Sequence, residues 1–141
     1  MLKIAVVYWS GTGNTEAMAR AVLEGVRSAG AEGTMYPASD FSPDLIEKFD
    51  GFAFGCPSMG AESLEDGEFE PMFEACKPLL AGKKLALFGS YGWGDGEWMR
   101  NWEEDCKASG AELVCQSVIC CEAPDEDAVN RCKQSGMALA Q

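Results

Sequence analysis

Six small, uncharged residues near the start of the chain, Ser10-Gly11-Thr12-Gly13-Asn14-Thr15, have the composition of a loop that binds a phosphate. Their Ser and Thr hydroxyls can donate to an anion, and glycine lets the backbone approach it closely. A helix is expected to begin at about Asn14, so its unpaired first-turn amides and the positive end of its dipole would face the phosphate. The loop therefore predicts an anion site that needs no Lys or Arg.

This loop does not match the commoner phosphate-binding sequences. A P-loop nucleoside triphosphatase needs Gly-Lys followed by Ser or Thr, and the loop has no lysine. The dinucleotide fingerprint G-x-G-x-x-G needs Gly or Ala at its sixth position, where Glu16 stands. A low-molecular-weight phosphatase needs an arginine six positions after its nucleophilic cysteine, and none of the seven cysteines has one. ATP hydrolysis, NAD binding at this loop and phosphatase chemistry are disfavoured, and a phosphate monoester is favoured.

Two further loops each carry one flat or polarisable side chain beside glycine. Met59 lies in an acidic loop from Cys56 to Asp66, and Trp93 lies in a glycine-rich loop from Gly89 to Gly96. A thioether and an indole suit the two faces of a conjugated ring, and such stacking contributes roughly 1–3 kcal/mol per ring. The alternative for Trp93 is an ordinary surface or core tryptophan.

Alternating patterns of strand and helix place these loops at one end of a sheet. Apolar runs predict five strands, over Leu2–Tyr8, Glu32–Pro37, Gly51–Gly55, Lys84–Phe88 and about Leu113–Cys121. Helical patterns follow them, from Asn14 to Ala29, Ser42 to Lys48, Phe69 to Leu80, Trp98 to Gly110, and Pro124 to the C-terminus. Trp98 and Trp102 have the spacing of a packed helix face, whereas Trp9 is ambiguous.

This fivefold alternation predicts a doubly wound α/β sheet. Ligands of such sheets bind beyond the carboxyl ends of the strands, where the strand order reverses. The loops that follow the first, third and fourth strands would therefore meet in one crevice. Cys121 and Glu122 would reach the same rim, although their residue types suggest no specific role there.

The composition predicts one soluble domain over residues 1–141. No apolar run approaches the ~20 residues of a membrane span, and no secretory signal is evident, so we expect a cytoplasmic protein. The chain has no histidine, which excludes imidazole acid–base chemistry and histidine metal ligation. The seven cysteines include no C-x-x-C, so neither a disulfide framework nor a metal site is indicated, and most should be reduced and buried.

The chain is strongly acidic, with 23 Asp and Glu against 11 Lys and Arg and a net charge of −12. This charge argues against nucleic acid and anionic membrane surfaces and favours a basic protein partner, although acidity can also serve solubility alone. Between Lys48 and Lys77 there is no basic residue, and the acids there are Asp50, Glu62, Glu65, Asp66, Glu68, Glu70 and Glu74.

Taken in order along the chain, three stretches resemble the flavodoxin family. Tyr8-Trp9-Ser10-Gly11-Thr12-Gly13-Asn14-Thr15 is similar to its phosphate loop, Cys56-Pro57-Ser58-Met59-Gly60-Ala61-Glu62 to its inner-face loop, and Phe88-Gly89-Ser90-Tyr91-Gly92-Trp93-Gly94-Asp95-Gly96-Glu97-Trp98 to its outer-face loop. The resemblance spans the whole chain and implies a short-chain fold with strand order 2-1-3-4-5, helices on both faces and a non-covalently bound FMN. It implies these cofactor-binding residues: Trp9, Ser10, Gly11, Thr12, Gly13, Asn14, Thr15, Pro57, Ser58, Met59, Gly60, Ala61, Glu62, Ser90, Tyr91, Gly92, Trp93, Gly94 and Asp95.

The resemblance also implies a role for each ring-side residue. Met59 would cover one face of the FMN ring and Trp93 the other, and Glu62 would accept a hydrogen bond from a ring N–H. On one-electron reduction the Met59–Gly60 peptide would turn so that the Gly60 carbonyl accepts a hydrogen bond from the flavin N5.

The implied function is that of a low-potential one-electron carrier shuttling between semiquinone and hydroquinone, not an enzyme with catalytic residues. We expect a monomer that serves basic redox partners, such as ferredoxin-type reductases and oxidoreductases. The acids between Lys48 and Lys77 are expected to lower the hydroquinone potential and to assist docking.

Two other functions stay open. An FMN-dependent NAD(P)H:quinone or azo-dye reductase could use the same fold, although the chain is short, shows no nicotinamide site and would cover the ring with Trp93. A non-redox interaction module would be supported by a colourless purified protein.

Overall fold

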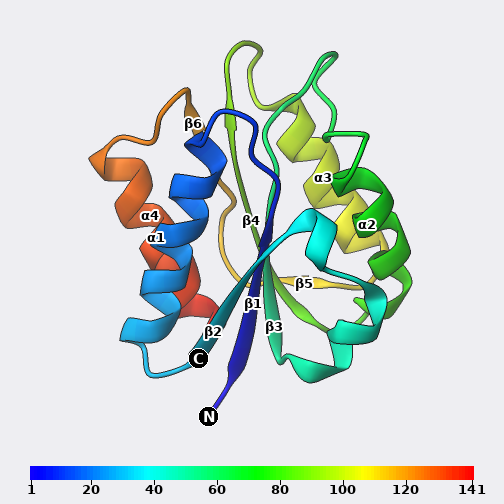
Figure 1. Ribbon diagram of the computed structural model, residues 1–141, viewed down its shortest axis with the longest axis vertical. Helices are drawn as coiled ribbons and strands as arrows, with labels where there is room; N and C mark the ends of the chain where they lie inside the picture. Colours follow the sequence, from blue (N-terminus) through cyan, green and yellow to red (C-terminus); the bar gives the residue numbers. More distant parts are fainter.

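A parallel sheet lies between two layers of helices (Figure 1). The structure is a computed structural model that describes residues 1–141. The strands pair in the order β2-β1-β3-β4-β5, and every registered pair is parallel. The predicted order 2-1-3-4-5 is thus confirmed, with strands β1 (Lys3–Tyr8), β2 (Glu32–Pro37), β3 (Gly51–Gly55), β4 (Lys84–Tyr91), β5 (Glu112–Leu113) and β6 (Val118–Cys121).

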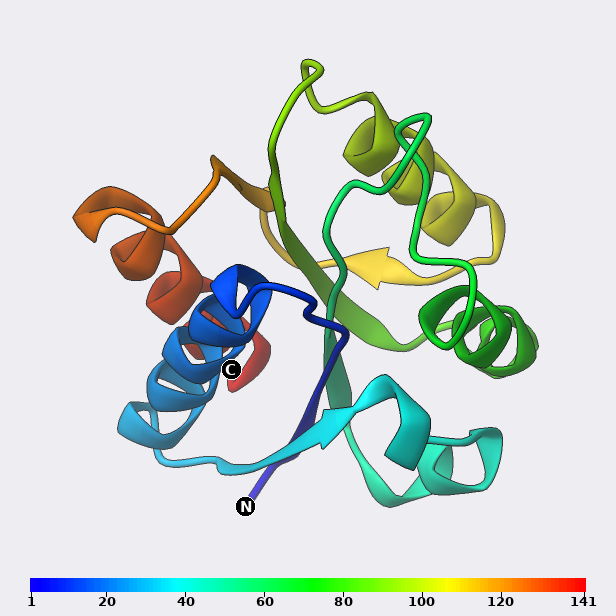
Figure 2. The same ribbon diagram turned by 45° about the horizontal axis from the view of Figure 1, so that its top comes forward.

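Helices cover both faces of this sheet, as Figure 2 shows. On one side lie α1 (Asn14–Ser28) and α4 (Glu126–Leu139), and on the other lie α2 (Phe69–Cys76) and α3 (Glu97–Ala108). The helix predicted after Ser42 is a 3₁₀ helix, η2 (Pro43–Lys48), and the short 3₁₀ helices η1 (Ala38–Asp40) and η3 (Lys77–Leu79) complete the elements. No helix is long and apolar enough to cross a membrane.

The central strands are buried on both faces, and their side chains alternate between two apolar clusters. Val7 and Phe54 join the cluster under α2 and α3, whereas Val6 and Ala53 join the cluster under α1 and α4. Trp98 and Trp102 are each 2% exposed and pack in the first cluster, which confirms the predicted packed face of α3.

The predicted fifth strand is wrong in one respect, because it is interrupted. Leu113 pairs with Leu85 of β4, and the next registered pair is Val118 with Phe88. Four residues of one chain segment therefore face two residues of β4, and the surplus loops out. The Ser117 hydroxyl in this loop donates to Glu103 Oε2 on α3 at 2.6 Å instead of lying in a regular ladder.

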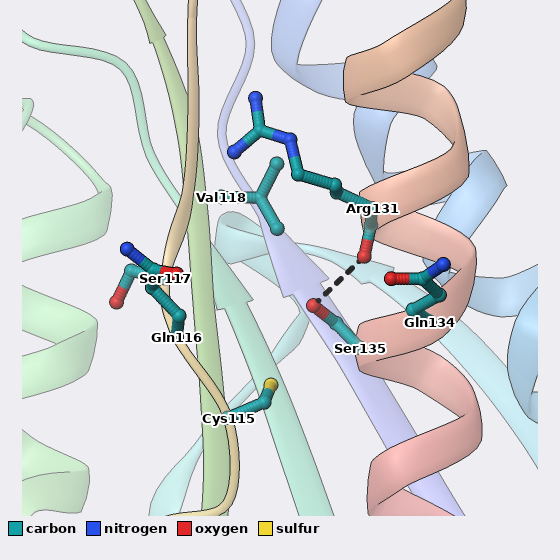
Figure 3. Close-up of a pocket in the computed structure, with 7 residues that line it drawn as sticks. All are labelled: Cys115, Gln116, Ser117, Val118, Arg131, Gln134 and Ser135. Atoms are coloured by element: carbon teal, nitrogen blue, oxygen red, sulfur yellow. Dashed lines mark hydrogen bonds between the residues drawn. The ribbon is translucent and has the colours of Figure 1, made fainter.

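The interruption borders a cavity of about 150 Å³ between the loop and α4 (Figure 3). The Ser135 hydroxyl, on its α4 wall, donates to the Arg131 carbonyl at 3.2 Å. Its lining residues are Cys115, Gln116, Ser117, Val118, Arg131, Gln134 and Ser135.

All seven cysteines are free. Four of them are buried, as expected, and burial raises the pKa of the Cys56, Cys106 and Cys132 thiols to about 12. These thiols pack as small apolar groups and stay protonated at neutral pH.

Candidate functional site

A crevice of about 260 Å³ lies at the carboxyl ends of the strands. These ends form the upper edge of the sheet in Figure 1. Four segments line it: three of them follow β1, β3 and β6, and the fourth is the end of β4 with Gly92 after it. Ten of its eleven lining residues are among the predicted site residues, so the structure brings the three loops together. The lining consists of Trp9, Gly11, Thr12, Asn14, Pro57, Ser58, Met59, Ser90, Tyr91, Gly92 and Glu122.

The other predicted residues belong to the same loops but do not line this crevice. Ser10, Gly13 and Thr15 shape the first loop and the start of α1. The remainder extend from the second and third loops: Gly60, Ala61, Glu62, Trp93, Gly94 and Asp95.

The first loop is held in the shape of an anion cradle. The Ser10 hydroxyl accepts hydrogen bonds from the Gly13 and Glu16 amides at 3.1 and 3.2 Å. Gly13, the N-cap of α1, has φ +97°, which glycine adopts without strain. The Asn14 and Thr15 amides lie in the first helical turn, where no carbonyl of the helix can accept from them.

Thr15 supplies an independent sign that an oxygen-rich group fits this cradle. The residue is 1% exposed, and its Oγ1 has no hydrogen-bond partner. An unpaired buried hydroxyl costs roughly 1–3 kcal/mol, a cost that a phosphate oxygen at the loop would remove. The donors that are present therefore fit the phosphate of FMN.

Two exposed side chains stand beside the crevice. Met59 is 37% exposed, and Trp93 is 63% exposed, which rules out a core position for that indole. Met59 is fixed by two backbone hydrogen bonds with Ser63, at 2.8 and 3.0 Å, that close a tight turn. Within the turn Gly60 has φ +49°, and a Cβ there would meet nothing within 4 Å.

A carboxylate joins the second loop to the third. Glu62 Oε1 accepts from the Asp95 amide at 3.1 Å. A Cβ at Gly94 would lie 1.7 Å from that same oxygen, so only glycine allows the close approach. The resemblance implies a ring N–H as a partner of Glu62, whereas no sequence pattern indicates the contact with the Asp95 amide, which joins the carboxylate to the third loop.

Sequence analysis placed Glu122 at the rim without a role and gave Glu68 no place at the site. Glu122 lines the crevice with φ +62°, and its carbonyl accepts from the Ser90 hydroxyl at 2.8 Å. Its position after the last strand indicated that it would reach the rim, whereas its residue type indicated no role there. Glu68 was counted only as a charge, yet its Oε1 accepts from the Trp9 indole N–H at 2.9 Å.

Glu65 proves to be structural rather than solvent-facing. It is 9% exposed, and its carboxylate accepts from the amides of Gly67, Glu68 and Phe69 at 2.7–2.8 Å. Burial alone would raise the pKa of this carboxyl, but the three amides hold it below its usual range. The acidic loop therefore owes its shape, and the start of α2, to one of its acids.

Known proteins resemble this chain over nearly its full length. The family model described as Flavodoxin matches residues 6–136. A flavodoxin of Megasphaera elsdenii is 44% identical over 98% of each chain, and one of Clostridium beijerinckii is 44% identical over 96% of this chain and 97% of that protein.

Solved structures of flavodoxins are also similar to this chain. The solution structure of the two-electron reduced Megasphaera elsdenii flavodoxin has a TM-score of 0.89 and 44% identity, and the match covers 97% of this chain and 98% of that one. A flavodoxin from the domain Archaea has a TM-score of 0.88 at 26% identity, covering 99% of this chain and 96% of that one. The chain belongs to the flavodoxin family, whose members are electron-transfer proteins that bind FMN.

Proposed function

We propose that this protein is a low-potential one-electron carrier that passes electrons to redox partner enzymes. FMN bound in the crevice would accept and give up one electron at a time, working between its semiquinone and hydroquinone. The observation that carries the proposal is the set of loops at the crevice. They bring together a phosphate cradle with an unpaired Thr15 hydroxyl, the exposed indole of Trp93 and the thioether of Met59.

Different residues of the chain would hold the phosphate and the ring of FMN. The Thr12, Asn14 and Thr15 groups would bind the phosphate with the first-turn amides, without a cationic side chain. Met59 and Trp93 would cover the ring faces, and Glu62 would accept from a ring N–H at the end of the crevice. A covered ring favours electron exchange at its edge over reaction with a substrate stacked upon it.

Acidic side chains between Lys48 and Lys77 would lower the hydroquinone potential and would help a basic partner to dock. At ~10 Å from the ring, one negative charge opposes a second one by about 0.4 kcal/mol at the dielectric of water and about 1.7 kcal/mol at an effective value of 20. Asp66 and Glu70 are exposed and have no side-chain hydrogen bond or ion pair, so they are free to act on the potential and on a basic partner. We propose a monomer that acts in the cytoplasm on partners such as ferredoxin-type reductases.

Stepwise reduction of the purified protein under argon tests this function. We expect a yellow protein whose visible spectrum passes through a blue neutral radical before bleaching. A colourless protein that takes up no FMN would contradict the proposal, and so would direct bleaching with no radical. Steady-state oxidation of NADPH with a quinone, at a rate typical of an enzyme, would favour a reductase instead.

A further inference from the structure

Trp9 occupies the junction between the first two loops of the crevice. Its backbone amide donates to the Gly55 carbonyl at 3.0 Å, which ties it to the end of β3. A Cβ at Gly11 would lie 3.0 and 3.2 Å from the Trp9 ring atoms Cη2 and Cζ3. The indole therefore lies against the backbone of the phosphate loop, while it also lines the crevice. The position of this ring limits where the loop can sit.

One hydrogen bond fixes the ring from the far side. The Trp9 Nε1–H donates to Glu68 Oε1 at 2.9 Å, across 59 residues of sequence. The Glu68 backbone is itself anchored, because its amide donates to the buried Glu65 carboxylate at 2.8 Å. Phe69, the first residue of α2, donates to the same carboxylate and is fully buried. The carboxylate that holds the indole thus comes from a firmly positioned element.

Charge alone would make Glu68 unfavourable at this place. A carboxylate near the phosphate cradle repels a dianionic phosphate, since like charges disfavour one another at short range. Its hydrogen bond to the indole has the opposite effect, because it keeps the wall of the cradle in place. The two effects separate by substitution: glutamine keeps an acceptor oxygen and loses the charge, whereas alanine loses both.

We propose that Glu68 is a positioning residue of the FMN site, holding the Trp9 indole against the phosphate loop through its side-chain oxygen. Glu68 does not line the crevice and would act on the site through Trp9. The proposal deepens the function given above and rests on FMN binding in this crevice.

Two variants and two measurements test the proposal. FMN is titrated into apoprotein, with quenching of flavin fluorescence as the readout, for wild type, Glu68→Gln and Glu68→Ala. We expect Glu68→Ala to raise the Kd about fivefold, and Glu68→Gln to leave it within twofold of wild type or to lower it. The indole N–H resonance of Trp9, assigned by its loss in Trp9→Phe, should shift in apo Glu68→Ala and stay near its place in Glu68→Gln.

Trp9→Phe completes the comparison, because it keeps a ring and removes the donor. We expect it to raise the Kd as Glu68→Ala does, and the double variant to be no weaker than either single one. Glu70→Gln is the matched control. It removes a charge two residues from Glu68, at a side chain that has no hydrogen bond or ion pair, and it should leave the Kd and the Trp9 resonance unchanged.

Equal effects of Glu68→Ala and Glu68→Gln on the Kd would show that only charge matters and would overturn the proposal. Additive effects of Glu68→Ala and Trp9→Phe would do the same, as would a Trp9 resonance that is identical in wild type and Glu68→Ala. If the wild-type apoprotein did not bind FMN, the proposed function would fall as well, so the two failures are distinguishable.

Discussion

At the residue scale, Glu65 shows how one acid can shape the loop that carries Met59. Its carboxylate accepts three amide hydrogen bonds, and Glu65→Gln would set an amide N–H against one of those donors. We expect this variant to lower the free energy of unfolding by about 1.5–3 kcal/mol at pH 7. Urea unfolding measures the loss, and Asp66→Asn, an exposed neighbour, should change it little.

The same carboxyl predicts a pH dependence. Its pKa is lowered in the folded protein, so the stability that it contributes is present above its unfolded-state pKa of about 4.3 and is lost as the pH falls through the lowered value. The difference in the free energy of unfolding between wild type and Glu65→Gln should therefore become smaller when unfolding is followed from pH 6 down to pH 3. A gap that stays constant over this range would contradict the assignment.

Gly60 is the residue whose backbone must change if the Met59–Gly60 peptide turns on reduction. It has φ +49°, a region that costs an L-residue about 1–2 kcal/mol, and the space around it is open. We expect Gly60→Val to weaken the neutral radical, so the first reduction potential should become more negative by about 40–90 mV and the maximum yield of the radical should fall. Spectroelectrochemical titration measures both. Gly30→Val places the same side chain at another open glycine of positive φ, in the turn after α1, and an equal response to the two variants would argue against a turn of the Met59–Gly60 peptide.

At the scale of elements, α1 and α4 pack with their backbones in near contact. A Cβ at Gly136 would lie 2.1 Å from the Val22 carbonyl oxygen, and one at Gly25 would lie 2.0 Å from the Lys133 carbonyl oxygen. Because backbone cannot move aside as a side chain can, Gly136→Ala should separate the helices and lower the free energy of unfolding by about 1–3 kcal/mol. Urea unfolding of Met137→Ala, which changes an exposed residue of α4, provides the control. A Gly136→Ala protein as stable as wild type would show that the helices part without cost.

The elements were predictable where pattern alone decides them. Strong apolar runs and helix signals located β1, β3, β4 and the four α-helices, and loops after parallel strands must gather at one edge. The break in the fifth strand was not predicted, because the sequence was read as one run from Leu113 to Cys121, and the Ser117–Glu103 contact within the break joins residues that no periodicity relates. The Trp9–Glu68 and Glu62–Asp95 contacts escaped for the same reason, since each joins residues that no periodicity relates.

At the scale of the whole molecule, the two ends of the sheet differ in what they offer a partner. The carboxyl ends carry the crevice, with Trp93 exposed and Asp66 and Glu70 free, whereas at the amino ends Glu32 lies 3.9 Å from the ammonium of Lys3. A net charge of −12 gives the molecule a long-range attraction for any basic protein. Under the proposed function, Asp66 and Glu70 at the carboxyl ends would decide which end such a protein meets.

Electron transfer to a basic redox protein should therefore be fast at low salt and should slow as salt is added. The Debye length falls from about 10 Å at 0.1 M ionic strength to about 3 Å at 1 M, so attraction beyond direct contact is lost over this range. Replacing Asp66 and Glu70 by Asn and Gln should reduce both the rate at low salt and its slope against ionic strength, as stopped-flow mixing would show. The matched variant changes Glu32 and Glu112 to Gln at the opposite end of the sheet, with the same change of net charge. If that variant lost as much as the first, net charge alone would govern encounter, and the crevice end would have no special role in docking.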